Sequence, residues 1–318
     1  MLVQKVPISD AAPYRYEAPA STHDFFPWAE ANKQDIEMQL RTFGAVLFRG
    51  FQLTRQSVFD GVLSFFCRHV ITGYGDLPPE EGTDRVYRST PYPADIAILF
   101  HNESSHMSSW PTRQFFGCVT ASPVGGETPL VDCRRIYRRI PADVRERFKE
   151  RGLLYVRRFI SGIDVSWQAF FKTKSKEEVE SSCLRRGWRC EWDARGALTV
   201  SQPSQAIAQN PITGEWSFFN QIMLHHPHFL PTEERETLEE ILGPQGLPRG
   251  VTYGDGSPIE TSVLNMIFEL YEAESVAFGW REGDVLMLDN MSIAHGRAPF
   301  SGPRKIIVGL GDPIEMFR

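Results

Sequence analysis

The sequence predicts an α+β protein with a mainly β core, flanked by helices and interrupted by others. Short apolar runs typical of strands lie near both ends of the chain, and segments with helical periodicity gather in the middle. No G-x-G-x-x-G follows a strand, so a dinucleotide-binding βαβ array has no support. With 318 residues the chain is long enough for one large catalytic domain. We expect a single domain over 1–318, with a helical insert at about 132–275.

Periodicity and helix-ending residues predict the first elements. Residues 1–27 contain four prolines and are expected to be extended. A helix is predicted over 29–43, because Gly44 can take the left-handed conformation that commonly ends helices. Residues 45–48 form an apolar run typical of a buried strand, and a helix with one apolar face follows Thr54. The runs 96–100 and 114–120 predict two more strands, which places His101 at a strand end.

The rest of the chain is predicted to be helical first and then to return to strands. Short helices are expected from Asp132 and from Pro141, the second ending at Gly152. Further helices are predicted over 175–187, over 232–242 and after Ser257. Strands are predicted over 285–288 and 305–310. Both ends of the chain thus contribute strands to one core.

Composition excludes several classes of protein. The net charge of −6 gives no basic field for nucleic acid. No apolar run reaches the roughly 20 residues of a membrane span, and the N-terminus lacks the pattern of a signal peptide. Five cysteines without a C-x-x-C argue against a disulfide framework or a zinc site. We therefore expect a cytoplasmic protein with reduced thiols.

Two distant segments carry residues that suit a metal site. His101-Asn102-Glu103 follows one predicted strand, and His295 follows another strand and the turn at Asp289-Asn290. Two imidazoles and one carboxylate leave coordination positions open, which suits Fe(II) that binds a co-substrate and O2. An H-x-[DE] triplet alone is weak, because about one is expected by chance in this composition. The strand contexts and the basic residues after His295 make the combination more specific.

At this point the chain resembles the taurine dioxygenase (TauD/TfdA) family of Fe(II)/2-oxoglutarate oxygenases, and most closely its SyrP-like branch. The resemblance covers nearly the whole chain and is strongest in its terminal block. It is carried by the segments 86–93, 101–103, 125–129, 167–173, 219–221, 283–297 and 302–304. It implies a double-stranded β-helix (jelly roll) and a hydroxylase that uses Fe(II), 2-oxoglutarate and O2.

The resemblance also implies roles for individual residues. His101, Glu103 and His295 match the iron ligands, and Thr128 matches a threonine that hydrogen-bonds a 2-oxoglutarate carboxylate. Arg304 is our choice for the arginine that pairs with the distal carboxylate. Lys305 faces the other side of the same predicted strand, and a guanidinium makes the bidentate pair that an ammonium does not. Arg297 is a third candidate for this role.

Other residues are weaker candidates for contact with the substrate. These are Asn102, His106, Asn220, Trp167 and Arg297. The triplet of histidines at 225, 226 and 228 is more simply a loop than a second metal site, since adjacent histidines do not all face one ion. The basic run Arg134–Arg139 is most simply a solvated helix face. The SyrP-like resemblance adds a second interpretation, in which this run docks an acidic peptidyl carrier protein.

The sequence favours hydroxylation of an amino acid or an amino-acid-derived small molecule, free or carrier-bound, in specialised metabolism such as antibiotic biosynthesis. Halogenases of the superfamily lack the carboxylate ligand, so Glu103 disfavours halogenation. Desaturation or cyclisation stays open, as does a catabolic sulfonate or aryloxy acid, although those relatives usually have Asp in place of Glu103. A non-enzymatic β-barrel binding or regulatory protein is the alternative from another class. The oligomeric state is left open, a homo-oligomer included.

Overall fold

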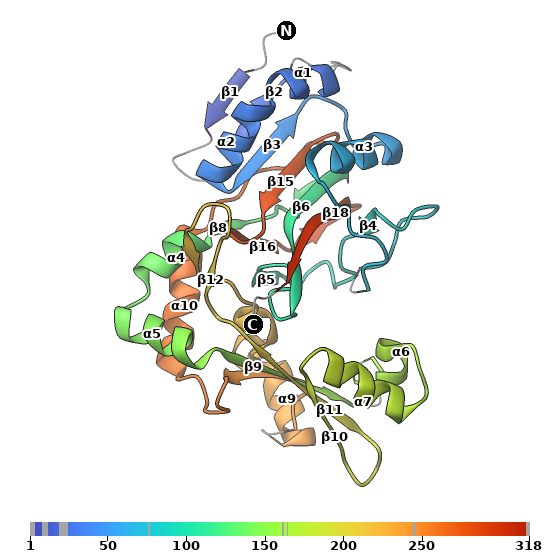
Figure 1. Cartoon of the computed structure of the whole chain (residues 1–318), viewed down its shortest axis with the longest axis vertical. Coiled ribbons are helices and arrows are strands. Elements are labelled where there is room, and N and C mark those ends of the chain that lie inside the picture. Colours follow the sequence, from blue (N-terminus) through green and yellow to red (C-terminus); the bar gives the residue numbers. More distant parts are fainter. Residues whose placement is uncertain are drawn as a thin grey trace.

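A computed structural model describes residues 4–7, 12–18, 25–75, 77–160, 162–163, 165–243 and 246–315. Its largest sheet has seven strands and draws on both ends of the chain (Figure 1). In sheet order these strands are β1 (Gln4–Pro7), β2 (Tyr14–Glu17), β3 (Ala45–Arg49), β15 (Val285–Asp289), β6 (Ser109–Thr120), β18 (Lys305–Glu315) and β4 (Tyr87–Arg88). Neighbouring strands are antiparallel except β2 and β3.

The central strands contain buried apolar runs because both faces of the sheet are covered. On β15, Val285 and Met287 pack with helices, whereas Leu286 and Leu288 face the opposite core. The helices on the first face are α1 (Phe25–Ala31), α2 (Lys33–Phe43) and α3 (Gln56–Phe66). Gly44 ends α2 with φ 73°, as the sequence predicts, but the predicted helix over 29–43 is split near Asn32.

A three-stranded sheet lies against the other face and carries the site. Its order is β5 (Ile98–His101), β16 (Ile293–Arg297) and β8 (Leu130–Asp132). Residues of β8 and β16 share one apolar core with residues of β3, β6, β15 and β18. The strand β7 (Val124–Gly125), which precedes β8 in the chain, pairs with β17 (Phe300–Ser301), which follows β16. The prediction of a β core flanked by helices is confirmed, whereas the assignment as a double-stranded β-helix stays a prediction.

The middle of the chain forms a separate layer at the lower end of the molecule in Figure 1. Its helices are α4 (Cys133–Arg139), α5 (Ala142–Arg151), α6 (Trp167–Phe171), α7 (Lys176–Arg185), α8 (Ile222–His225), η1 (Pro227–Phe229), α9 (Thr232–Leu242) and α10 (Thr261–Glu274). The helices α4, α5, α7, α9 and α10 begin and end close to the predicted residues: Asp132 caps α4, and α5 is followed by Gly152. The short helices α6, α8 and η1 were not predicted. The two ends of this segment meet at an antiparallel bridge between Leu130 and Val276.

The segment predicted as a helical insert contains strands as well as helices. The insert also contains a four-stranded sheet of β10 (Arg189–Trp192), β11 (Leu198–Ser204), β9 (Leu153–Phe159) and β14 (Arg249–Tyr253), and a pair of β12 (Ala208–Gln209) and β13 (Trp216–Ser217). In β11 the buried residues alternate with more exposed ones, which is the half-buried pattern of a strand. These strands are short and rich in polar residues, so their periodicity is weak in the sequence.

No helix in the described residues is both long and apolar enough to cross a membrane.

Candidate metal centre and its cavity

Strand pairing brings together the three residues expected to bind iron. His295 on β16 lies directly opposite His101 at the end of β5, and their ring centroids are 4.4 Å apart. Glu103 follows in the turn after β5. One ligand atom from each of the three residues lies within 4.8 Å of the others. Residues almost 200 positions apart thus present two nitrogens and one carboxylate oxygen at one point.

The state of both imidazoles suits a metal. Nδ1 of His101 donates a hydrogen bond of 2.9 Å to the carbonyl oxygen of Leu99, which leaves Nε2 as the ring nitrogen that faces a metal. Burial, with a smaller contribution from His101, holds the pKa of His295 well below its usual value, so that its ring is neutral. Nδ1 of His295 is buried without a hydrogen-bond partner in the described part of the chain. The donor set and this unpaired nitrogen fit a divalent metal ion.

Asn290 joins the two halves of the site. Its side chain is fully buried, and Oδ1 accepts a hydrogen bond of 2.7 Å from the backbone N–H of Glu103. Its Nδ2 donates to the carbonyl oxygens of Glu103, at 2.9 Å, and of Pro111, at 2.8 Å. The turn that carries Glu103 is therefore fixed to the segment between β15 and β16. The sequence motif includes Asn290, but the contacts of Asn290 with Glu103 are visible only in the structure.

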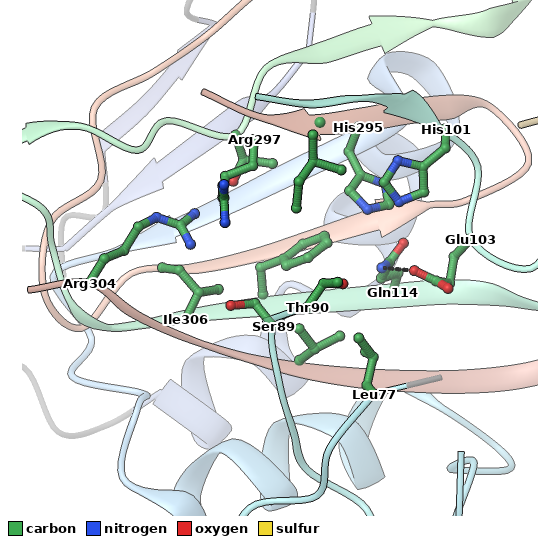
Figure 2. Close-up of a pocket in the computed structure, with 15 residues that line it drawn as sticks. Leu77, Ser89, Thr90, His101, Glu103, Gln114, His295, Arg297, Arg304 and Ile306 are labelled. Carbon is green, nitrogen blue, oxygen red and sulfur yellow. Dashed lines mark hydrogen bonds between the residues drawn. The ribbon is translucent and has the colours of Figure 1, made fainter. Parts of the chain in front are cut away.

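The carboxylate of Glu103 is held through both of its oxygens. The hydroxyl of Tyr74 donates to Oε1 at 2.5 Å, and Nε2 of Gln114 donates to Oε2 at 3.2 Å, the bond dashed in Figure 2. Sequence reasoning missed both residues. Gln114 was expected only as part of a strand, and Tyr74 lies in a loop that no motif marks.

A cavity of about 50 Å³ runs from the metal-binding residues to two arginines (Figure 2). Arg304 and Arg297 lie at one end, and His101, His295 and Glu103 at the other. Its walls combine hydroxyl groups with apolar side chains: Ser89, Thr90, Thr128, Leu77, Ile98, Phe116, Ile306 and Val308. The cavity is therefore cationic at one end and has the candidate metal ligands at the other, with uncharged walls between them.

Arg304 projects into the cavity from the residue before β18. Its Nε donates to the carbonyl oxygen of Gly126 at 3.0 Å, and this glycine matters because a Cβ there would lie 3.0 Å from the arginine side chain. Within the described residues, neither terminal nitrogen of Arg304 has a hydrogen-bond partner. Burial, followed by repulsion from Arg297, lowers the pKa of Arg304 to about 10. The guanidinium stays charged at neutral pH and its terminal nitrogens are available to an anion.

Lys305 turns away from the cavity, as the alternation of side chains along a strand predicts. Its ammonium group lies 3.0 Å from a carboxylate oxygen of Glu80 on the exposed side. Thr128 is buried at the cavity wall, and its hydroxyl oxygen accepts a hydrogen bond of 3.1 Å from the indole of Trp280. The hydroxyl proton of Thr128 is thus left to donate to another acceptor.

Three of the weaker candidates have structural roles. Arg297 donates to the carbonyl oxygens of Tyr92, Pro93 and Ile96, at 3.1, 2.5 and 2.6 Å, and so fastens the segment before β5. Asn102 is fully buried and donates to the carbonyl oxygen of Asn290. Asn220 donates to the carbonyl oxygen of Ala206 and accepts from the N–H of Ile222. These side chains make hydrogen bonds to backbone groups, and Arg297 also lines the cavity. That they contact substrate stays a prediction.

His106 lies in a polar cluster between the turn of Glu103 and the insert. Its ring lies 5.3 Å from that of His225 and 5.7 Å from that of Tyr155. Burial, with the charges of Arg249 and Arg157, lowers the pKa of His106 to about 3. His225 contacts Gln221 and Arg249, and the described residues place no carboxylate ligand set around the histidine triplet. Trp167 packs against Trp192 instead of entering the cavity.

The basic run on α4 is largely neutralised by acids of the same chain. Arg134 pairs with Asp132 and Glu215, and both Arg135 and Arg139 pair with Glu274. Three of the four arginines in 134–139 thus have carboxylate partners. This segment is closer to a solvated helix face than to a free cationic patch.

The comparisons agree with this geometry. Residues 8–310 match the family described as "Taurine catabolism dioxygenase TauD, TfdA family". The chain belongs to this family. It is 34% identical over 309 residues to the dapdiamide synthesis protein DdaC of Enterobacter agglomerans, covering 97% of this chain and 94% of DdaC. It is 30% identical over 292 residues to a clavaminate synthase-like protein of Arabidopsis thaliana, covering 88% of this chain and 85% of that protein.

Solved structures support the fold of this TauD/TfdA-family dioxygenase. A taurine dioxygenase from Burkholderia xenovorans superposes with a TM-score of 0.59 at 17% identity, over 98% of this chain and 91% of that one. AAD-2, in complex with Mn(II) and N-oxalylglycine, gives a TM-score of 0.57 at 12% identity, over 99% of both chains. The family is Fe(II)/2-oxoglutarate-dependent, and the chain is a dioxygenase, which decides against the non-enzymatic alternative. The SyrP-like branch stays a prediction.

Proposed function

We propose that the enzyme binds Fe(II) through His101, Glu103 and His295, binds 2-oxoglutarate with Arg304 and Thr128, and hydroxylates an unactivated C–H of an amino acid or amino-acid-derived substrate. The observation that carries this proposal is the cavity, which has a metal-binding end and a cationic end. A five-carbon dicarboxylate has the complementary pattern, with a carboxylate at each end. When bound, Fe(II) with 2-oxoglutarate and O2 supplies the oxidising power for C–H hydroxylation.

The protein's contribution is to bind, orient and exclude water. Arg304 receives one carboxylate of the co-substrate in a bidentate pair, inside a wall that limits competition from water. Thr128, whose hydroxyl oxygen is occupied by Trp280, donates its proton to a carboxylate oxygen. Arg297 holds the segment 92–96 and adds positive potential at the same end. Each of these groups is in place before a ligand arrives.

The substrate class rests on the relatives. DdaC is named for dapdiamide synthesis, and similarity over nearly the whole of both chains favours a related amino-acid-derived substrate in specialised metabolism. Desaturation or ring closure stays the first alternative chemistry, because the same oxidant serves these reactions. A catabolic sulfonate or aryloxy acid has weaker support, because the taurine dioxygenase and AAD-2 match at less than 20% identity and carry only the fold.

Docking of a carrier protein is the second proposal for substrate delivery. It draws on the basic run of α4, but the ion pairs with Glu274 reduce the charge available to an acidic partner. If a carrier docks there, reversing Arg135 and Arg138 to Glu should lower turnover of a carrier-bound amino acid and leave turnover of the free one unchanged. Equal effects on both substrates would remove the proposal. Residence in the cytoplasm stays a prediction.

The central test is anaerobic reconstitution with Fe(II) and 2-oxoglutarate, followed by absorption spectroscopy and a screen of amino acids. We expect a metal-to-ligand band that substrate perturbs, and O2 consumption coupled to succinate release. His101→Ala should abolish the band and the turnover while the far-ultraviolet circular dichroism is unchanged. Retained turnover in this variant would mean that the ligands are misassigned.

A further inference from the structure

The carboxylate of Glu103 lies between the side chains of Tyr74 and Gln114. We infer that Tyr74 and Gln114 are positioning residues for this iron ligand: each holds a different oxygen of the Glu103 carboxylate, so that the long side chain presents one fixed orientation to the metal. The inference rests on the proposed function, because it assumes that Glu103 is a ligand. It concerns residues that neither the motifs nor the comparisons assign.

Contacts of both its backbone and its ring fix the position of Tyr74. The backbone N–H of Tyr74 donates a hydrogen bond of 3.0 Å to the hydroxyl of Tyr87, and the centroids of the two rings lie 5.9 Å apart in an edge-to-face arrangement. Tyr87 lies on β4, is 1% exposed, and donates to the carbonyl oxygen of Asp84 at 2.7 Å. The N–H of Gly73 donates to the same carbonyl at 3.0 Å. The loop that carries Tyr74 is therefore anchored to the edge of the large sheet.

Gln114 is fixed by the sheet itself. It lies on β6 opposite Leu288 of β15 and Leu310 of β18, and its side chain is 1% exposed. Its Nε2 donates to Oε2 of Glu103, while its buried Oε1 has no hydrogen-bond partner in the described part of the chain. Turning the amide over would place an acceptor against the carboxylate. The carboxylate therefore sets the orientation of the amide.

The backbone of Glu103 is also constrained. The side chain of Asn290 hydrogen-bonds to both the N–H and the carbonyl oxygen of Glu103, as described above. Ser104 takes a left-handed conformation with φ 55°, which is uncommon for a residue with a side chain, and its Oγ lies 2.6 Å from the hydroxyl of Tyr74. The same phenol thus contacts the ligand and stabilises the strained residue after it.

The geometry answers a problem that a glutamate ligand creates. Glutamate has one more rotatable bond than aspartate, so it loses more side-chain freedom when it is fixed for metal binding. Two neutral donors on different oxygens remove that freedom before the metal binds, and they leave the other lone pairs of the carboxylate available. Outer partners of this kind typically change metal affinity 10- to 100-fold when they are removed.

The test measures metal binding without turnover. Mn(II) is titrated into the metal-free protein without 2-oxoglutarate, and the electron paramagnetic resonance of the free ion gives the dissociation constant. We expect Tyr74→Phe and Gln114→Leu each to weaken Mn(II) binding about 10-fold or more. The matched control is Tyr137→Phe, which removes the same hydroxyl from a tyrosine that stacks on Trp216 outside the cavity. It should bind Mn(II) as the wild type does.

A second measurement separates positioning from general stability. Glu103→Asp shortens the carboxylate by one carbon, so it should lose contact with the two donors and bind Mn(II) more weakly. In the Tyr74→Phe background the same shortening should weaken Mn(II) binding less, because the hydrogen bond from Tyr74 is already absent. If the losses of Mn(II) binding free energy in the two single variants add up to that of the double variant, the inference is overturned. The melting temperature of each metal-free variant is recorded, and if Tyr74→Phe does not fold, Gln114→Leu with Glu103→Asp provides the cycle.

Failure of the inference and failure of the proposed function give different results. A wild-type protein that does not bind Mn(II) would remove the proposed metal site, whatever the variants do. Wild-type binding that Tyr74→Phe and Gln114→Leu leave unchanged would remove only the inference.

Discussion

Loss of the Arg304 guanidinium should weaken 2-oxoglutarate binding while metal binding stays intact. One nitrogen of Arg304 already donates to Gly126, which leaves its two terminal nitrogens for the co-substrate. A charge-assisted hydrogen bond contributes about 1.5–3 kcal/mol, so two of them correspond to about 3–6 kcal/mol. Arg304→Met should therefore raise the dissociation constant of 2-oxoglutarate by at least about 100-fold. Arg304→Lys keeps the charge but loses the bidentate geometry, so its dissociation constant for 2-oxoglutarate should lie between those of the wild type and Arg304→Met.

The assay is calorimetric titration of 2-oxoglutarate into protein loaded with Mn(II), without O2. Lys305→Met is the control, because it removes the same charge one residue later, from a side chain that is half exposed and paired with Glu80. It should change the dissociation constant by less than about twofold, as expected for an exposed pair. If Lys305→Met weakens binding as much as Arg304→Met does, the cavity's cationic end is misassigned.

Three further expectations test other parts of the site. Asn290→Ala removes three hydrogen bonds to backbone groups, one of them fully buried, and should lower the free energy of unfolding by about 3 kcal/mol in urea titrations, with metal affinity falling as well. Trp280→Phe frees the hydroxyl of Thr128 and should weaken 2-oxoglutarate binding several-fold in the same calorimetric assay, with Mn(II) binding unchanged. His106 and His226 have pKa values lowered by burial to about 3 and about 4, so the unfolded chain binds more protons than the folded one below about pH 6.5. Stability of the metal-free protein should fall as pH decreases from 6.5 to 4, by about 1.4 kcal/mol per unit for each histidine, and His226→Asn should flatten this slope.

Much of the fold was predictable because its signals are local. Gly44 ends a helix, Asp132 caps one, and the predicted helix over 232–242 has the bounds of α9. The strands β3, β15 and β18 were predictable because burial on both faces gives each of them a continuous apolar or glycine-containing run. The strands of the insert were missed, since a half-buried strand with polar residues resembles a loop in composition.

The candidate site divides in the same way. His101, Glu103 and His295 were predicted from motifs, and the structure places them together. That Asn102, Asn220 and Arg297 contact substrate stays a prediction. The hydrogen bonds that these side chains make to backbone groups were not predictable, because no side-chain pattern reveals them.

Tyr74, Gln114 and Trp280 were missed because each acts through one contact made across the fold. Tyr74 reaches Glu103 from a loop, and Trp280 reaches Thr128 from 152 residues away. Sequence spacing carries no trace of such contacts.

The bridge between Leu130 and Val276 has a consequence for how the enzyme family diversifies. The long excursion of the chain between β8 and β15 leaves and re-enters the core at one pair of backbone hydrogen bonds, of 2.8 and 2.9 Å. His101 and His295 lie outside that excursion, on strands that pair with each other. The intervening layer is therefore joined to the core at one place in the chain, but Asn220 and Gln221 within it hydrogen-bond to the backbone of Asn102, next to Glu103. A transplanted layer would need to match the separation of its two ends and to keep these contacts with the turn that carries Glu103.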